Sequence, residues 1–271
     1  MKNLAKKIAK TIIPRAFHVP IVRMLASKKP LRTVYGKPSA DVLDCCIAYN
    51  EFGGFCVPLS TYRMGPEQRI LRGGVWEPET VSFITAHCAG GDVIHAGAHI
   101  GDFLPAISKS LGKDAKVWAF EPSPVYFRCA SITMLVNNLR NVELIQSGLG
   151  RQKGAAEIVI KAEGKTLGAR SWIVDENLRQ QTSRDDSETT KINISAIDDI
   201  VPKDRYVSII HLDIEGYEPA ALDGAMATIQ RCKPILIIEV HFSDEEWLLT
   251  KLGPLGYVKT AGFDGNYIME A

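Results

Sequence analysis

From residue 91 onwards the hydrophobic positions alternate between two spacings. Short apolar runs rich in Val and Ile, typical of buried strands, are followed by segments with an apolar residue every three or four positions, typical of helices. In the segment 102–111, for example, Phe103, Ile107 and Leu111 share one helical face. Strands that alternate with helices in this way predict βαβ units and a parallel sheet. The predicted strands of this sheet are 91–97, 116–122, 142–146, 207–213 and 234–241.

Two of the segments between these strands carry clear helix signals. Ser123 followed by Pro124 is typical of a helix start, because serine caps the first turn and the N–H that proline lacks has no partner there. We expect this helix to run to about Asn138, and a second helix to occupy residues 218–230.

Between the third and fourth strands the alternation stops. Residues 155–160 and 191–197 have strand patterns, and the stretch between them is polar and rich in Gly, Ser, Arg and Asp. We expect an antiparallel pair with a loop at its tip. Near the C-terminus, residues 256–262 and 266–270 flank an Asp-Gly pair, which predicts a β-hairpin.

The whole pattern predicts one α/β domain over residues 91–271. Its core would be a doubly wound, mostly parallel, Rossmann-like seven-stranded sheet, with an antiparallel C-terminal strand and a β-hairpin insertion. Residues 41–90 contain few helical signals before Pro78. We expect them to form an N-terminal layer that covers the substrate side of the sheet.

The charge is distributed unevenly along the chain. The net charge is +1, but residues 1–40 carry ten Lys or Arg and no acidic residue, whereas residues 41–271 carry 22 basic and 31 acidic residues, a net charge of −9. Within this basic arm, Leu4, Ile8 and Ile12 would share one face of an amphipathic helix. A basic arm on an acidic body predicts contact with an anionic surface, and a solvated tail without a partner is the alternative.

The arm has no apolar run long enough for a signal peptide or a transmembrane helix. We therefore expect a cytoplasmic protein, peripheral to the inner face of the membrane through residues 1–30. A nucleic acid is a less suitable partner, because the body of the protein is acidic.

The turn after the first strand, HAGAHIG at 95–101, suits the close approach of a ligand. Gly97 and Gly101 lack a Cβ, and the turn opens a helix whose N-terminus favours negative charge. The spacing is G-x-x-x-G rather than the G-x-G-x-x-G of dinucleotide-binding enzymes. Tight packing between helix and strand is the alternative explanation for both glycines.

Two more strand ends carry acidic residues. Glu121 lies 24 residues after Gly97, where a carboxylate can accept hydrogen bonds from both hydroxyls of a ribose, although it could also be a surface carboxylate. Asp213, Glu215 and Glu218 crowd the end of the fourth strand, where carboxylates are costly unless they face a cleft. Ligands of doubly wound sheets bind beyond the carboxyl ends of the strands, so we predict a site there.

Taken together, these motifs resemble the FkbM family of S-adenosylmethionine (SAM)-dependent methyltransferases. The resemblance extends from about Gly74 to His241 and consists of six motifs in the order of the family. These motifs are WEPET, HAGAHIGDF, WAFEPSP, NNLRNVEL, LDIEGYE with AALDGA after it, and PILIIEVH.

The resemblance implies that SAM is the cofactor of this chain. Glu121, with Pro122 after it, would hold the ribose, Ser147 and Gly148 would lie near the adenine, and Ser171 matches a family serine. The loop around the methionine part of the cofactor would consist of His95, Ala96, Gly97, Ala98, His99 and Gly101. The reaction end would be formed by Asp213, Glu215, Glu239 and His241, of which Asp213 also contacts the cofactor.

Three positions depart from the family pattern, and all three are histidines. His95 replaces an acid that helps to bind the ammonium group of the cofactor, His99 replaces an asparagine, and His211 replaces a lysine. A neutral His95 could still accept one hydrogen bond. Histidine titrates near neutral pH, so a pH-sensitive site is one hypothesis; ordinary core or loop histidines are the alternative.

Methyl transfer from a sulfonium to oxygen requires an aligned acceptor, a shielded site and a group that accepts a proton. An alcohol acceptor has a high pKa and benefits from a positioned base. Candidates are His241, Asp213, Glu239 and His211, and we expect Asp213 to position the acceptor and His241 to take the proton. No metal constellation is evident, although Asp213 with Glu239 could bind Mg²⁺.

The sequence therefore predicts a SAM-dependent methyltransferase that methylates a hydroxyl of a sugar, a glycan or a secondary metabolite. The basic arm favours a glycan or glycolipid assembled at the inner membrane. Two alternatives remain open. One is a non-catalytic module of the same fold that docks on a membrane or another anionic partner. The other is a nicotinamide-dependent oxidoreductase, which the glycine spacing disfavours.

Overall fold

A computed structural model describes residues 42–271, except for 163–164, 169–170, 175–186 and 241–244. The chain divides into two units, Met1–Leu43 and Asp44–Ala271, and every element below belongs to the second unit. The predicted amphipathic helix of the basic arm and the predicted catalytic residue His241 lie outside the described residues.

The centre of the second unit is a seven-stranded sheet with the strand order β13-β14-β12-β11-β3-β4-β5. Its five parallel strands are β3 (Asp92–Ala96), β4 (Val117–Phe120), β5 (Val142–Ile145), β11 (Val207–Leu212) and β12 (Ile235–Glu239). The C-terminal hairpin of β13 (Val258–Phe263) and β14 (Asn266–Glu270) continues the sheet, with β14 antiparallel to β12. The predicted fold class is confirmed.

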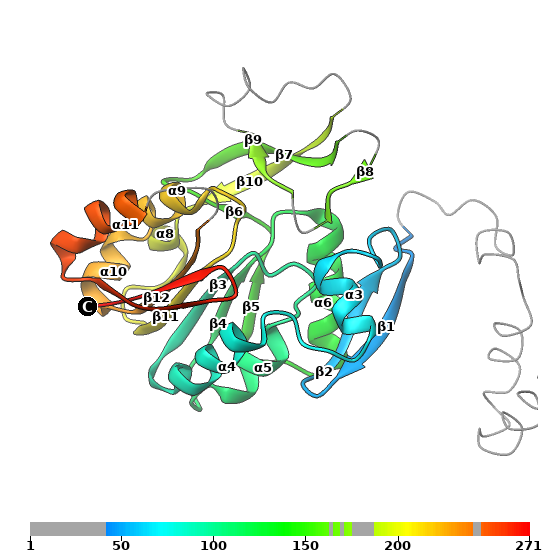
Figure 1. The fold of residues 1–271 in the computed structure, drawn as a ribbon, viewed down its shortest axis with the longest axis horizontal. Helices are drawn as coiled ribbons and strands as arrows, with labels where there is room; N and C mark the ends of the chain where they lie inside the picture. Colours follow the sequence, from blue (N-terminus) through cyan, green and yellow to red (C-terminus); the bar gives the residue numbers. More distant parts are fainter. Residues whose placement is uncertain (1–41, 163–164, 169–170, 175–186, 241–244) are drawn as a thin grey trace, which may run out of the picture. The chain divides into compact units, whose positions relative to one another are not determined.

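Helices cover both faces of this sheet (Figure 1). One face packs against α4 (Pro78–His87) and α5 (Leu104–Ser110). The other packs against α8 (Ile197–Ile200), α9 (Glu218–Asp223), α10 (Met226–Cys232) and α11 (Glu245–Leu252). Successive strand residues such as Ile209 and Ile210 enter opposite cores, which explains the continuous apolar runs. No helix in the described part of the chain is long and apolar enough to cross a membrane.

The part of the N-terminal layer that precedes α4 is a hairpin and a short helix. Strands β1 (Cys45–Asn50) and β2 (Gly53–Pro58) pair antiparallel, and β2 packs on α6 (Pro124–Val136), where Cys56 N donates to Thr133 Oγ1 at 3.0 Å. The helix α3 (Gly65–Leu71) forms in the stretch before Pro78, where the sequence has few helical signals. Tertiary contacts hold it, because Glu67 and Ile70 are buried and Glu67 accepts a 2.6 Å hydrogen bond from Thr61.

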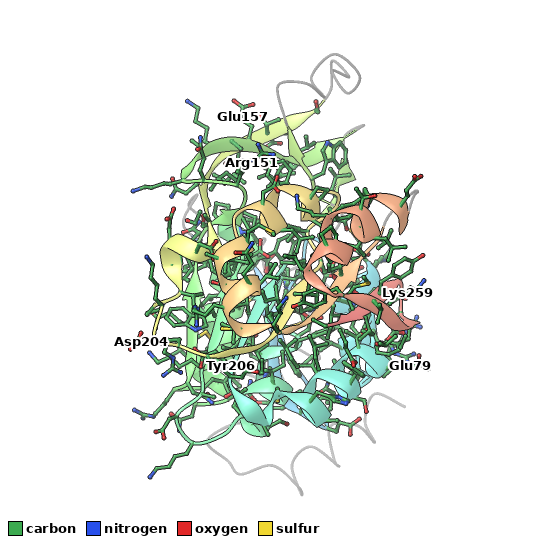
Figure 2. The ribbon with its side chains drawn as sticks, turned by 90° about the vertical axis from the view of Figure 1, so that its left-hand side faces the viewer. Glu79, Arg151, Glu157, Asp204, Tyr206 and Lys259 are labelled. Carbon is green, nitrogen blue, oxygen red and sulfur yellow. The ribbon has the colours of Figure 1, made fainter. Side chains whose placement is uncertain are left out.

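The insertion between β5 and β11 forms a second, smaller sheet. Its strands are β6 (Gly148–Leu149), β7 (Gly154–Ala162), β8 (Lys165–Thr166), β9 (Ile173–Val174) and β10 (Glu188–Ser195). The predicted antiparallel pair is β7 with β10. At the base of the insertion Arg151, labelled in Figure 2, donates to the Asp223 carboxylate of α9 at 2.6 Å.

The helix predicted over 218–230 is in fact two helices, α9 and α10, with a break at Gly224. A Cβ on Gly224 would lie 2.1 Å from the carbonyl oxygen of Gly150, so the chain bends where the insertion approaches it. A residue of α8 caps the N-terminal end of α10. The Asp198 carboxylate accepts hydrogen bonds from Ala227 N and Thr228 N, both at 2.8 Å. A cap from a distant segment leaves no local sequence signal.

This long-range cap predicts the effect of one substitution. Asp198→Ala removes the acceptor for two backbone N–H groups of α10, and we expect the free energy of unfolding to fall by about 0.5–2 kcal/mol. Urea denaturation followed by circular dichroism measures the change. The neighbouring Asp199→Ala is the control, because the Asp199 side chain is exposed; equal losses in the two variants would contradict the role of the cap.

Candidate functional site

A cavity of about 490 Å³ lies at the carboxyl ends of β3, β4, β11 and β12. This volume is within the range of small-molecule sites. Residues that follow the four strands form its floor, the N-terminal layer contributes Met64, Trp76 and Glu77, and the insertion contributes Leu149, Ile158 and Ile173. The site is therefore enclosed by the two parts of the chain that lie outside the regular βα alternation.

The glycine turn after β3 packs tightly onto the end of β11. Gly97 has φ 86°, and a Cβ at this position would lie 1.9 Å from the carbonyl oxygen of Asp213. Gly97 N and Ala98 N both donate to the Phe120 carbonyl, at 3.1 and 3.0 Å. Only glycine fits at position 97, because any side chain would collide with the backbone of β11.

Glu121 is a buried wall of the cavity rather than a surface carboxylate. It is 5% exposed, and its two oxygens accept hydrogen bonds from His99 N and Ser123 N, both at 2.8 Å. Burial raises the pKa of Glu121 to about 7, although His99 and the two N–H groups act in the opposite direction. Ser123 precedes α6 as predicted, but its side chain makes no capping hydrogen bond. Each Glu121 oxygen keeps a second lone pair for a ligand hydroxyl.

Other carboxyl groups line the same cavity. Asp213 and Glu239 are hydrogen-bonded to each other; burial, and then this contact, raises the pKa of Asp213 well above its usual range. Burial also raises the pKa of Glu239 to about 7, of Glu77 to about 8 and of Asp102 to about 6. So many buried carboxyl groups favour a cationic ligand.

Two of the three histidines that differ from the family pattern form a buried pair. His95 on β3 and His211 on β11 are register partners, and their Nδ1 atoms are 2.8 Å apart. The ring of Phe103 stacks on both imidazoles, with centroid distances of 5.1 and 5.4 Å. Burial lowers the pKa of His211 to about 4 and that of His95 well below its usual range. Both rings are neutral at physiological pH, which contradicts the hypothesis of a pH-sensitive site for this pair.

The third histidine, His99, differs from this pair because its pKa is raised rather than lowered. Its Nε2 lies 3.4 Å from the Glu67 carboxylate of α3, and its ring packs on Tyr126 at 4.2 Å between centroids. Burial would lower the pKa of His99, but Glu67, then Asp102 and Glu121, raise it to about 8. A protonated His99 therefore links the N-terminal layer to the glycine turn.

The structure brings most of the predicted site residues to this cavity. His211, Ala98 and Gly101 lie behind its wall: Ala98 is in the core and Gly101 packs against α6. Ser171 lines the cavity, and its hydroxyl donates to the Gly168 carbonyl at 2.8 Å. The predicted residues that line the cavity are His95, Ala96, Gly97, His99, Glu121, Pro122, Ser147, Gly148, Asp213, Glu215 and Glu239.

Sequence reasoning missed several residues of the cavity. Glu77 and Asp102 stand within the motifs WEPET and HAGAHIGDF, so those motifs were a usable signal. Tyr126 and Met64 gave none, because only tertiary packing brings them to the site. Within the described ranges, no group of three or more His, Cys, Asp or Glu side chains is arranged to hold a metal ion.

Comparison with known proteins decides the family. The model of the methyltransferase FkbM domain matches residues 95–260, more than half of the chain. This chain belongs to the FkbM methyltransferase family. The match covers the glycine turn, Glu121, the acidic strand ends and the insertion of this FkbM chain. Membership of a methyltransferase family overturns the oxidoreductase alternative.

Among curated proteins, the FkbM chain is similar to "Methyltransferase 1" from Beauveria bassiana (strain ARSEF 2860). The two are 26% identical over 145 residues, which is 49% of this chain and 57% of the relative. The chain thus matches little more than half the length of that relative.

Similar solved structures include a methyltransferase FkbM from Methylobacillus flagellatus KT, with a TM-score of 0.44 and 18% identity over 67% of this chain and 43% of that one. Another is a SAM-dependent methyltransferase from Aquifex aeolicus, with a TM-score of 0.38 and 17% identity over 72% of this chain and 90% of that one.

The carboxyl groups of the FkbM cavity predict how stability depends on pH. Glu77 and Glu121 have folded pKa values of about 8 and 7, above an unfolded value of about 4.3, and His99 has about 8 against about 6.5. Between pH 6.5 and 8 the folded chain therefore binds more protons than the unfolded chain, so its stability falls as the pH rises. We expect the melting temperature of the ligand-free protein to fall across this interval in differential scanning fluorimetry.

Glu77→Gln tests the origin of this slope. The substitution removes one ionisation and keeps a hydrogen-bond acceptor for Asn266 Nδ2, which lies 3.0 Å from Glu77 Oε2. We expect it to raise the melting temperature at pH 8 by about 2–4 °C, the effect of about 1 kcal/mol in a domain of this size. Glu79→Gln, at an exposed position, should leave the slope unchanged; a flat profile in the unsubstituted protein would contradict the assignment.

Proposed function

We propose that this chain is a SAM-dependent methyltransferase that methylates a hydroxyl group of a sugar, a glycan or a secondary metabolite. The observation that carries the proposal is the cavity at the carboxyl ends of four parallel strands, which is lined by the fixed carboxyl group of Glu121 and by several further carboxyl groups. A cationic ligand stabilises the ionised form of these carboxyl groups, and SAM carries a sulfonium and an ammonium group.

The residues present suit this cofactor. Glu121 has free lone pairs for the ribose hydroxyls, and the turn at Gly97 has no side chain between the backbone and the cavity. Near Ser147 the wall is apolar, because Leu149 and Ile173 line it, which suits the faces of an adenine ring. The Ser147 hydroxyl already hydrogen-bonds within the insertion, to the Gly148 and Asn193 carbonyls, so we assign it a supporting role.

The acceptor would enter between the N-terminal layer and the insertion. Trp76 and Tyr126 provide aromatic surface there, and Glu77 provides a polar edge. A mixed surface of this kind suits an acceptor that has both apolar faces and hydroxyl groups. Sugars and hydroxylated secondary metabolites have this character.

SAM, when bound, supplies an activated methyl group, and the protein has three tasks. The enclosing layers exclude water from the cavity. Asp213, at the end of β11, positions the acceptor hydroxyl. Of the candidates to receive its proton, Glu239 suits the role beside His241, because burial raises the pKa of Glu239 to about 7, and a general base works best when its pKa is near the working pH.

Cofactor binding is tested by calorimetry with S-adenosylhomocysteine (SAH), the demethylated cofactor. We expect Glu121→Ala to weaken binding at least tenfold, about 1.4 kcal/mol. Glu143→Ala is the control, because Glu143 is exposed on β5. A melting curve shows whether the Glu121 variant is folded, since this residue also holds two backbone N–H groups. No binding to the unsubstituted protein at millimolar SAH would favour the non-catalytic docking module.

The acceptor is tested with SAM that carries a ¹³C-labelled methyl group and a panel of glycans, glycolipids and hydroxylated metabolites. The chemical shift of the transferred methyl group distinguishes an O-methyl from an N-methyl or S-methyl product. An N-methyl or S-methyl product would contradict the proposed chemistry.

Membrane contact through residues 1–30, and a cytoplasmic location at the inner face of the membrane, remain proposals based on the ten basic residues of the arm. We expect deletion of residues 1–30 to reduce sedimentation with vesicles that contain anionic phosphatidylserine, and high salt to have the same effect on the full chain. Neutral phosphatidylcholine vesicles are the control. Equal sedimentation of the two proteins would remove the basis of the proposal.

A further inference from the structure

Apolar side chains are exposed together on β1 and α6. Eleven large apolar side chains of the described residues are exposed, and five of them lie on these two elements. Leu135 is 79% exposed and Tyr49 is 66% exposed, and the other three are Ile47, Val125 and Val136. Single apolar side chains are ordinary on a protein surface, whereas a contiguous group marks a site of interaction.

The side chains of β1 and α6 meet at the seam between these two elements. Tyr49 is the register partner of Gly54 on β2, and a Cβ on Gly54 would lie 2.7 Å from both Tyr49 Cε1 and Val136 Cγ1. Tyr49 and Val136 are therefore neighbours above Gly54, where the hairpin of β1 and β2 lies beside α6 (Figure 1). Ile47 is two residues from Tyr49 and shares its face of the strand.

The outer side of α6 extends this contact along the helix. Val125, Ile132 and Val136 are seven and then four residues apart, so they form one row, and Leu135 lies beside it. Leu135 also borders a groove of about 520 Å³, whose apolar lining consists of Phe127, Met134, Leu135, Leu139 and Leu144. We call the group Ile47, Tyr49, Val125, Ile132, Leu135 and Val136 the α6 surface.

The α6 surface also differs in charge from the rest of the body. Residues 41–271 have a net charge of −9, yet residues 122–142 contain no acidic residue and two arginines, Arg128 and Arg140, both exposed. Arg140 lines the groove. The acidic residues of the neighbouring hairpin, Asp44 and Glu51, stand beyond the two ends of β1.

Exposed apolar side chains, an apolar groove and arginines together match an anionic lipid, which has apolar chains and a negative phosphate. The sequence before β1 supports the same partner. Residues 1–40 carry ten Lys or Arg and no acidic residue, and they join the body just before the strand that carries Ile47 and Tyr49. A second copy of this chain is a less suitable partner, because a two-fold contact through this surface would bring the arginines of the two copies together.

We propose that the α6 surface docks on an anionic membrane, with Tyr49, Leu135 and Val136 inserted among the lipid headgroups. The inference deepens the proposed membrane contact, on which it rests: the basic arm attracts the protein to the membrane, and the α6 surface supplies the apolar insertion. Tyr126 of the same helix lines the cavity. Docking through α6 therefore brings the cavity close to the membrane, where a glycolipid acceptor would be located.

Sedimentation of the full chain with vesicles of phosphatidylcholine and phosphatidylserine tests this proposal. We expect the combined substitution Tyr49→Ser, Leu135→Ser and Val136→Ser to weaken vesicle binding about tenfold, although the basic arm is intact. The matched control is Tyr206→Ser, Leu249→Ser and Val258→Ser, which removes the same three residue types at exposed positions elsewhere. It should bind vesicles as the unsubstituted protein does, and melting curves show whether both variants are folded.

Fluorescence quenching locates the contact directly. A tryptophan introduced by Leu135→Trp should be quenched by vesicles whose acyl chains carry bromine, beyond the quenching of the unsubstituted protein. Leu249→Trp, on α11, is the control and should add no quenching. Absence of quenching at position 135 in protein that is bound to the vesicles would overturn the insertion.

The outcomes separate this surface from the basic arm. If the triple variant binds vesicles as the unsubstituted protein does, or if the control variant loses as much, the α6 surface is not the docking site and the contact through the arm stands. If the unsubstituted protein binds no anionic vesicles, both membrane proposals fail and the methyltransferase proposal is unaffected. If ultracentrifugation shows a dimer that the triple variant converts to a monomer with unchanged vesicle binding, the surface is an interface between copies and the proposal is overturned.

Discussion

The contact between Gly97 and the backbone of β11 holds the site together. Because no Cβ is present, the turn after β3 can lie against the Asp213 carbonyl, and the same turn is tied to β4 through the Phe120 carbonyl. The ends of three adjacent strands are therefore fixed relative to one another by backbone contacts. Side chains that follow these strands, Glu121 and Asp213 among them, are brought into one cavity without needing to bond to each other.

That arrangement gathers carboxyl groups where water is scarce. Burial raises the pKa of Glu77, Glu121 and Glu239 to between about 7 and 8, so in the ligand-free protein these groups oppose folding as the pH rises. The buried carboxyl groups thus lower the free energy of unfolding at this end of the sheet. Binding of a cationic ligand to the folded state would raise it again. The same carboxyl groups that favour a cationic ligand therefore destabilise the ligand-free protein.

The histidines divide the site into two electrostatic regions. His99, next to Glu67, is protonated near neutral pH, whereas burial lowers the pKa of His95 and of His211 and keeps both rings neutral. The same residue type thus serves as a cation on one side of the glycine turn and as a neutral hydrogen-bonding group on the other. Burial is common to all three, and the difference arises from the neighbouring side chain.

The sequence by itself determined the parallel sheet, the hairpin insertion and the family, because strands buried on both faces require continuous apolar runs and because motifs keep their order along the chain. It also placed Glu121 and Asp213 at strand ends. It could not determine that α9 and α10 are separate helices, since Asp198 caps α10 from another element. Nor could it reveal the contact between His95 and His211, which are 116 residues apart. Protonation states and long-range caps depend on distances between segments, and only the tertiary structure sets those distances.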